Sequence, residues 1–556
     1  MKTFLGTNFG HSAAVALISE AGTILGAVEE GRIIGDKDTA KFPLASLQWL
    51  ISEFDPQVAA WHEGWIPHRR LLLKGSRDAL RYGLRDHSYL TDRFPRELRR
   101  FLCGQFQFRS WRGLAPGAFV GHHLAHAYSL LPAGLPPHSV ILVSDTIAEE
   151  ESISVFFWTG QHMHRLRRSL YPHSIGHAFH RFAHHVGFRG RTAPGTLMAL
   201  ASYGEPRWLP QLRRLVEVSD ATVRFDLKRL PIWHRTTAWL QLAERIDDSE
   251  FAAALIRSRG APQAALDLAA SVQCWFTEMT LQCIVDSIRI ATEEFGGRVQ
   301  SVGLAGGAAL NCKANSIFLE ACLSSGIELV ISPWSDDAGT AIGAAISAVL
   351  QERPRTHIPV AEPFLGPSAS NVRVRVEEEH LTPAIDLLCQ GGSVALISGR
   401  LEFGPRALGG RCILGDARDT KSRYRLNNIK GRPAFMPFAP AILAGDLDSF
   451  FDSPGSPWMT WTVRAKELAR HTIPAAVHCD GSARVQVVRE CDSKVLLSLL
   501  RAFKARTGVG VLLLTSLNGN GEAIPADLQT AIACARRLGL RGAITDQGWE
   551  ELPGSS

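Results

Sequence analysis

The chain contains 556 residues, of which 46% are hydrophobic and 21% charged, a composition typical of a globular protein with several domains. Its net charge of +6 comes without a dense block of lysine and arginine interleaved with aromatic residues, which argues against a nucleic-acid partner. The chain contains no run of about 18 apolar residues, so no membrane span is predicted. The ten cysteines form no CxxC pair, which argues against a zinc ribbon or disulfide scaffold and for reduced thiols in a cytoplasmic protein.

The first residues, MKTFLGTNFGHSAAVALI, place Gly, Asn and His between apolar stretches, which favours strands and turns over a signal peptide. We expect a hairpin of Phe4–Leu5 and Val15–Ile18, then a strand over Thr23–Val28. Residues 139–166 repeat this layout, with Asp145 in the turn after a buried strand. Two related α/β halves would suit a cleft that holds a nucleotide, although any two hairpins look alike.

Three histidines stand close together in GHHLAHAYS, residues 121–129. On a helix, His122 and His126 lie one turn apart on the same face, while His123 points elsewhere. Two neutral imidazoles on one face can share a transition metal, but two do not hold it tightly. The alternative is a polar turn before a helix in a chain with 20 histidines.

Two later stretches, 298–323 and 328–350, each read as a strand, a turn and a helix. In the first, Gly306 and Gly307 would allow the backbone to approach a ligand at a helix N-terminus, which favours anions. In the second, DDAGTAIGAA places Asp336 and Asp337 before a helix of small residues. A glycine pair after a strand is a weak signal, and small residues can simply allow close helix packing.

Residues 351–370 are rich in Pro and Ser and mark a domain boundary. Beyond it, four segments each join an apolar strand to a polar, glycine-containing edge; they are 391–418, 427–443, 478–490 and 508–524. The polar residues at these edges include Arg406, Lys430, Arg484 and Ser516. Convergent cations and a hydroxyl predict an anion pocket, most naturally for phosphate, although any one of them could be an ordinary surface residue. Only 11 residues are lysines against 49 arginines, which makes Lys37, Lys313 and Lys430 noticeable.

Several motifs together resemble one family. EFGPRALGGRCILGDAR is the strongest, and NNIKGRPAFMPFAPAIL, DGSARVQ and LLLTSLNGNGEAI follow it in order, while HHLAHA, GLAGGAALNC and DDAGTAIGAA mark the N-terminal part. This ordered set resembles the ATP-dependent carbamoyltransferases of natural-product and nodulation-factor biosynthesis, which include the tobramycin and cephamycin carbamoyltransferases. The resemblance extends over nearly the whole chain.

The resemblance implies an α/β protein of two domains. An actin-like domain of two RNase H-like halves is expected over 1–355, a linker over 356–370 and a YrdC-like domain over 371–556. It also implies that the C-terminal domain cleaves carbamoyl phosphate and that carbamate passes internally to the N-terminal site. There ATP and carbamate would give carbamoyladenylate and pyrophosphate, and an acceptor hydroxyl would take the carbamoyl group and release AMP.

The resemblance further implies a metal site and a set of functional residues. His122, His126, Asp145 and Asp337 match the metal ligands, with Asp336 a rival for the last place; Fe(II) is expected, and Mn or Zn are physically possible. His11 matches a base for the acceptor hydroxyl, although a turn histidine is the alternative. The remaining matches are Lys37 near polyphosphate; Gly306, Gly307, Asn311 and Asp337 for the nucleotide; and Arg406, Lys430, Arg484 and Ser516 for carbamoyl phosphate.

The sequence departs from the family pattern in two places. Thr146 and Ala148 follow Asp145 where the family has a DGxGE pattern, so their side chains could crowd the nucleotide phosphates. Thr196 stands where the family commonly has Lys. Both departures bear on nucleotide affinity rather than on the metal ligands. Segment 205–262 is a candidate acceptor lining with its Trp208, Trp233 and Trp239, although core packing is favoured for these tryptophans.

The leading interpretation is an enzyme that O-carbamoylates a small natural product, with no nucleic-acid or membrane partner and an open oligomeric state. N-carbamoylation of an amine or guanidine is an alternative. Hydrogenase maturation is disfavoured because the chain has neither an acylphosphatase domain nor zinc-finger cysteines. The carbamoyl phosphate motifs argue against tRNA modification. A nucleotide-binding regulator that lost its chemistry is supported only by Thr146 and Thr196.

Overall fold

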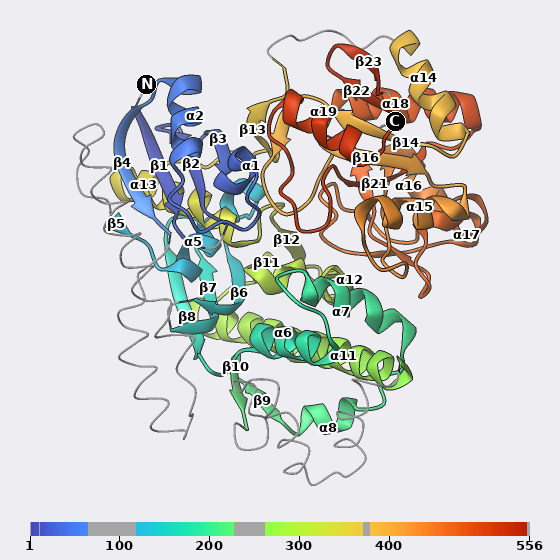
Figure 1. Cartoon of the computed structure of the whole chain (residues 1–556). Coiled ribbons are helices and arrows are strands. Elements are labelled where there is room, and N and C mark those ends of the chain that lie inside the picture. Colours follow the sequence, from blue (N-terminus) through green and yellow to red (C-terminus); the bar gives the residue numbers. More distant parts are fainter. Residues whose placement is uncertain are drawn as a thin grey trace.

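The computed structural model describes residues 2–10, 12–64, 118–148, 150–226, 262–370 and 378–552. Two sheets and their helices form the N-terminal part of the molecule, and a third sheet forms a separate body beside them (Figure 1). We call the elements from β1 to α13 the N-terminal domain and those from β13 to β23 the C-terminal domain. In the ranges described, no helix is both long and apolar enough to cross a membrane.

The first sheet has five strands. From edge to edge they are β3 (Ile24–Glu29), β2 (Ala14–Ser19), β1 (Lys2–Asn8), β4 (Gln57–Glu63) and β5 (Ala118–Phe119). The first three are antiparallel, and β4 and β5 continue the sheet in parallel. These strands confirm the predicted hairpin and third strand. All six residues of β2 are buried, as expected for a strand covered on both faces.

The second sheet repeats the order and the directions of the first. Its strands are β12 (Glu328–Ile331), β11 (Ser301–Ala305), β6 (Ser139–Ala148), β7 (Glu151–Trp158) and β8 (Met163–Leu170). Strands β6, β7 and β8 are antiparallel, and β11 and β12 continue in parallel from β6. A shared 3-2-1-4-5 order in both sheets confirms the duplicated, actin-like fold predicted for this part of the chain.

Helices pack closely on these sheets. In the N-terminal domain they include α1 (Glu30–Ile34), α2 (Leu44–Phe54), α5 (His122–Tyr128), α6 (Ile175–Val186), α7 (Ala193–Leu200), α8 (Leu209–Arg213), α11 (Pro262–Phe295), α12 (Cys312–Ser324) and α13 (Thr340–Glu352). A Cβ on Gly6 of β1 would lie 1.9 Å from the Ala341 carbonyl, and one on Gly343 would lie 1.7 Å from the Ala125 carbonyl. The small residues of α13 therefore let this helix contact both β1 and α5.

The C-terminal domain is built on a mixed sheet of seven strands. They are β20 (Gln486–Val488), β17 (Ala439–Leu443), β21 (Val511–Ser516), β16 (Arg411–Asp416), β14 (Ser393–Ile397), β22 (Gly542–Thr545) and β23 (Gly548–Glu551). Its longer helices are α14 (Glu378–Cys389), α15 (Thr420–Lys430), α18 (Lys494–Thr507) and α19 (Leu528–Arg537). This is the second α/β domain expected from the sequence.

The segment predicted as a linker contains a short strand. Strand β13 (Phe364–Ser368) pairs with β15 (Arg400–Glu402), so the Pro/Ser-rich composition does not prevent local pairing here. Arg400 donates to the carbonyls of Gly366 at 3.0 Å and of Leu25 at 3.1 Å, which ties β13 and β15 to β3 of the N-terminal domain. The domain limits 1–355 and 371–556 stay a prediction.

Candidate functional site

The two histidines of α5 that were predicted to share a metal are buried side by side. His122 and His126 expose at most 1% of their surface, and their Nε2 atoms lie 3.1 Å apart. The Nδ1 atom of His122 lies 3.1 Å from the carbonyl of Gly64. Donation from Nδ1 to this carbonyl leaves Nε2 as a lone-pair donor, which is the usual way a ligating imidazole is oriented.

Two carboxylates face these histidines. Asp145, near the end of β6, places Oδ2 at 3.7 Å from Nε2 of His122 and 3.4 Å from Nε2 of His126. Asp337, in the short 3-10 turn before α13, places Oδ1 at 3.7 and 3.9 Å from the same two atoms. All four ligand atoms lie within 4.8 Å of one another. The fold thus brings together the four residues predicted as ligands, with Asp337 rather than Asp336 in the group.

The four side chains shift one another's pKa values, so the protonation state of each depends on the other three. Burial lowers the pKa of His122, but hydrogen bonds and charge from Asp145 and Asp337 outweigh it and raise this pKa to about 10. Burial lowers the pKa of His126, and the charge of His122 lowers it further. Burial raises the pKa of Asp145, yet the two histidines bring it well below its usual range. One proton on His122 therefore faces two ionised carboxylates, and the remaining negative charge favours a cation.

This donor set fits a divalent metal. Two imidazoles and two carboxylates offer the nitrogen and oxygen donors that first-row transition metals use. Oδ2 of Asp145 is buried, and its neighbours among the residues described are the Nε2 atoms of His126 at 3.4 Å and His122 at 3.7 Å, both longer than a short hydrogen bond. A buried carboxylate oxygen needs a cation beside it, and a metal ion between these atoms would supply one. His123 lies outside this group, because its Nδ1 contacts Ser154 Oγ at 2.7 Å instead.

The glycine loop after β11 lies against the same carboxylate. Gly306 has φ +86°, and a Cβ there would lie 2.4 Å from the Ser144 carbonyl, so only glycine fits this position. A Cβ on Gly307 would lie 3.1 Å from Oδ1 of Asp145. Asn311 begins α12, and its Oδ1 accepts from the Ala314 amide at 3.1 Å. The predicted nucleotide loop and the predicted metal ligands are therefore neighbours.

A second site, in the C-terminal domain, gathers several cations. Arg406 and Arg484 form no hydrogen bond or ion pair with any residue in the ranges described, and the charge of Arg484, with burial, lowers the pKa of Arg406 to about 9. Lys430 is buried and donates to the Ser516 carbonyl at 2.6 Å and to Ser516 Oγ at 3.2 Å. Burial lowers the pKa of Lys430 to about 7, and the charge of Arg432 adds to this effect. Such a cluster of cations attracts an anion.

Two models of one protein family match this chain. The carbamoyltransferase N-terminus model matches residues 103–346, and the carbamoyltransferase C-terminus model matches residues 385–549. The chain belongs to the carbamoyltransferase family. The resemblance inferred from the sequence motifs is therefore confirmed.

Individual relatives of this carbamoyltransferase support the same assignment. It is 28% identical to nodulation protein NolNO of Sinorhizobium fredii, over 97% of this chain and 79% of that protein. It is 33% identical to the 3'-hydroxymethylcephem-O-carbamoyltransferase of Amycolatopsis lactamdurans, over 44% of this chain and 48% of that protein. An uncharacterized protein of Synechocystis, sll1178, is 29% identical over 97% of this chain and 94% of its own.

Solved structures show only distant likeness to this carbamoyltransferase. Full-length HypF in a phosphate- and nucleotide-bound form is 12% identical with a TM-score of 0.35, over 64% of this chain and 56% of that one. Component A of the (R)-2-hydroxyglutaryl-CoA dehydratase of Acidaminococcus fermentans is 14% identical with a TM-score of 0.33, over 63% of this chain and 99% of that one. The fold assignment rests on the repeated strand order described above.

Two arginines of the carbamoyltransferase sites were missed by sequence reasoning. Arg432 stacks its guanidinium 4.5 Å from the centre of the Phe438 ring, and burial and the charge of Arg484 lower its pKa to about 10. Arg191 lies 3.9 Å from Oδ2 of Asp337 and 3.6 Å from Oδ1 of Asp38. Neither has a spacing signal in the sequence, because tertiary contacts alone bring each arginine to its site.

The other predicted residues have mixed outcomes. Lys37 is partly buried, and its charge acts on Lys430 across the two domains of the carbamoyltransferase. His11, Trp233 and Trp239 lie outside the described residues. Trp208 is partly buried against the core of the N-terminal domain.

Three further positions concern the departures from the family pattern. Thr146 donates its amide to Asp145 Oδ1 at 2.9 Å, Ala148 is buried, and Thr196 donates its hydroxyl to the Thr192 carbonyl at 3.1 Å.

Proposed function

We propose that this carbamoyltransferase uses carbamoyl phosphate and ATP to carbamoylate a hydroxyl group of a small natural product. Water would cleave carbamoyl phosphate to carbamate and phosphate in the C-terminal pocket. An oxygen of carbamate would then attack the α-phosphorus of ATP, which releases pyrophosphate and leaves carbamoyladenylate. The acceptor oxygen would attack the carbamoyl carbon, lose its proton and release AMP. The observation that supports this sequence is the presence of two separate sites in one chain.

The C-terminal pocket is suited to a phosphate-bearing substrate. Arg406 and Arg484 have no acidic partner among the described residues and can both donate to phosphate oxygens. Donors already in place would also stabilise negative charge on the departing phosphate. Lys430 donates to Ser516 Oγ at 3.2 Å, and we expect either side chain to turn a donor toward the substrate.

The N-terminal site is suited to a nucleotide. His122, His126, Asp145 and Asp337 would hold a divalent ion, for which we propose Fe(II), with Mn and Zn as alternatives. When bound, this ion would supply a Lewis acid for phosphate oxygens. The absence of a side chain at Gly306 would let phosphate approach the backbone. Lys37 and Arg191 would offset charge on the phosphates, and His11 would accept the proton of the acceptor hydroxyl.

A hydroxyl acceptor is preferred to a nitrogen acceptor because one relative is named as an O-carbamoyltransferase acting on a 3'-hydroxymethylcephem. That name refers to a small molecule, which also supports a small-molecule acceptor here. A cytoplasmic location would supply ATP and carbamoyl phosphate. The identity of the acceptor is left to experiment, since acceptor pockets are built from loops without a readable code.

Pyrophosphate release without acceptor tests the proposal. Purified protein would receive ATP, carbamoyl phosphate and Fe(II), beside one sample with a chelator and one without carbamoyl phosphate. Pyrophosphate that requires both carbamoyl phosphate and metal is the expected result. If ATP binds but no pyrophosphate appears, extract of the producing cell is added. An enzyme that requires its acceptor would then release pyrophosphate, whereas a regulator without chemistry would not.

A further inference from the structure

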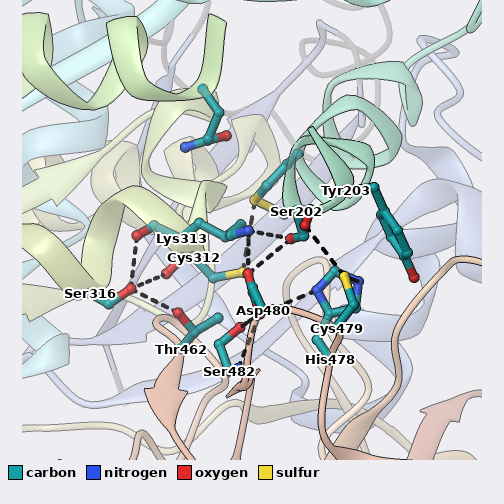
Figure 2. Close-up of polar contacts among 12 residues, drawn as sticks. Ser202, Tyr203, Cys312, Lys313, Ser316, Thr462, His478, Cys479, Asp480 and Ser482 are labelled. Atoms are coloured by element: carbon teal, nitrogen blue, oxygen red, sulfur yellow. Dashed lines mark hydrogen bonds and ion pairs between the residues drawn. The ribbon is translucent and has the colours of Figure 1, made fainter. Parts of the chain in front are cut away.

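An ion pair joins the two domains beside the anion pocket. Lys313, in the first turn of α12, places its ammonium 2.5 Å from Oδ2 of Asp480 in the C-terminal domain. The same ammonium donates to Ser202 Oγ, so it lies between a hydroxyl of its own domain and a carboxylate of the other (Figure 2). The two side chains of the ion pair expose 21% and 25% of their surface. Partial burial reduces screening by water, so this ion pair is stronger than one on the open surface.

Asp480 organises the turn that leads to Arg484. Its Oδ1 accepts the amide of Ser482 at 3.0 Å and the hydroxyl of Ser482 at 2.6 Å, and Nδ1 of His478 lies 3.6 Å away (Figure 2). Gly481 between them has φ +77°, as a tight turn requires. Burial raises the pKa of Asp480, but His478 and Lys313 bring it far below its usual range. The carboxylate is therefore ionised and fully engaged, and Arg484 follows four residues later.

The hairpin next to Arg484 is fixed to the same helix. Strand β18 (Val463–Arg464) pairs with β19 (Ser482–Ala483), directly before Arg484. The amide of Thr462 donates to the Cys312 carbonyl at 3.1 Å, and its hydroxyl lies 2.8 Å from Ser316 Oγ. Cys312 follows Asn311, the cap of α12, so the hairpin rests on the first turns of the helix that begins at the nucleotide loop.

The segment carrying Arg406 is held in the same way. Arg32 of α1 donates to the carbonyls of Glu402 and Gly404, and it forms an ion pair with Glu29 at 2.7 Å. A Cβ on Gly404 would lie 2.2 Å from the Pro333 carbonyl, which shows how closely this segment lies against the N-terminal domain. Two cations of the N-terminal domain therefore hold the two segments that carry Arg406 and Arg484.

We infer that Lys313 is a positioning residue of the carbamoyl phosphate pocket: through Asp480 it holds the Arg484 turn against α12 and thereby fixes the guanidinium that binds the phosphate group. The inference rests on the proposed function, because it assigns Arg484 to that substrate. It makes substrate binding in the C-terminal domain depend on a side chain of the N-terminal domain. Arg32 likewise holds the segment that carries Arg406. Because Arg32 is deeply buried, its substitution would disturb the fold more, so Lys313 is the better residue to test.

Removing the ammonium leaves Oδ2 of Asp480 partly buried without its cation. Breaking one partner of such a pair is costly because the remaining charge stays uncompensated. The turn can relieve this cost by moving Asp480 toward water, which carries Arg484 away from the pocket. We expect Lys313→Met to raise the KM for carbamoyl phosphate about tenfold, with a smaller effect on kcat.

The experiment measures phosphate release from carbamoyl phosphate by the full-length protein. Lys313→Met, Asp480→Asn and the double variant form a cycle, and Lys313→Arg tests rescue. Lys504→Met is the matched control, because Lys504 pairs with Asp446 at the same 2.5 Å but within the C-terminal domain. Thermal unfolding of every variant is recorded beside the kinetics, so that loss of stability is separated from loss of substrate affinity.

The expected result is a raised KM in both single variants, no further rise in the double variant, recovery in Lys313→Arg and an unchanged KM in Lys504→Met. A KM in Lys313→Met equal to that of the wild type overturns the inference, as does an equal rise in Lys504→Met. Wild-type protein that does not cleave carbamoyl phosphate would instead refute the proposed function. The two failures are therefore distinguishable in one assay.

Discussion

Nε2 of His122 lies 3.1 Å from Nε2 of His126, too close for two like charges in a buried site. The two imidazoles therefore share a single positive charge, which the pKa of His122, raised to about 10, assigns to that residue. Asp145, near the end of β6, and Asp337, in the 3-10 turn after β12, face this pair. A divalent cation would displace the proton and contact all four side chains, so metal binding should release a proton near neutral pH.

Loss of one ligand should remove the metal and the adenylate-forming step together. His126→Ala and Asp337→Asn are expected to lose bound metal after reconstitution with Fe(II) and to release no pyrophosphate. Both should still cleave carbamoyl phosphate, because the C-terminal pocket contains neither residue. Metal content by elemental analysis and the two release assays check this. His123→Asn is the control, since an Asn amide can replace the contact of Nδ1 with Ser154 Oγ; loss of metal there would contradict the assignment.

Arg484→Ala should have the opposite effect. Truncating a charged group that binds the phosphate is expected to weaken carbamoyl phosphate binding on the order of 100-fold. ATP binding should survive, and carbamate supplied directly at high concentration should restore some pyrophosphate release. Arg464, an exposed arginine on the neighbouring strand β18, provides the control Arg464→Ala. Normal cleavage of carbamoyl phosphate by Arg484→Ala would show that the pocket is wrongly assigned.

The sequence predicted parts of the site that depend on local spacing or on ordered motifs. His122 and His126 could be paired from their spacing alone, because four residues span one helical turn. Asp145 and Asp337 needed the family resemblance, since only the fold brings the ends of β6 and the turn after β12 together. The hairpin and third strand of each half followed from the alternation of apolar and turn residues, whereas the full strand order came only from the structure.

Several tertiary contacts, within and between the domains, left no signal in the sequence. Arg432 stacks on Phe438, and Arg32 reaches the carbonyls of Glu402 and Gly404, yet neither lies in a recognisable pattern of charges. Lys430 was predicted as a pocket cation, but the structure also engages its ammonium with the carbonyls of Ser516 and Asn518. Hydrogen bonds from side chains to backbone carbonyls depend on which carbonyls the tertiary fold leaves without backbone partners, and the sequence alone does not show this.

Gly306→Ala should impair the nucleotide site. A side chain there would require positive φ, which costs about 1–2 kcal/mol, and would clash with the Ser144 carbonyl beside Asp145. We expect a large loss of ATP affinity by calorimetry and a lower melting temperature. Gly296→Ala is the control, because Gly296 also has positive φ, +68°, but a Cβ there meets no atom within 4 Å. ATP affinity in Gly306→Ala equal to that of the control would contradict a role for this loop.

Anion binding to the C-terminal pocket should depend on pH through Lys430. Burial lowers its pKa to about 7, well below the ordinary value near 10.4, so the side chain loses its charge as pH rises through neutrality. A bound dianion favours the charged form and raises this pKa, so binding above pH 7 should take up a proton, and affinity should fall by at most about tenfold per pH unit.

Sulfate is the suitable probe because it stays a dianion between about pH 6 and pH 8.5, whereas phosphate itself titrates near pH 6 to 7. Calorimetry in two buffers of different ionisation enthalpy measures the proton uptake directly. Lys430→Met should bind sulfate more weakly and without this pH dependence; a wild-type affinity that is flat over the same range would show that Lys430 does not face the anion.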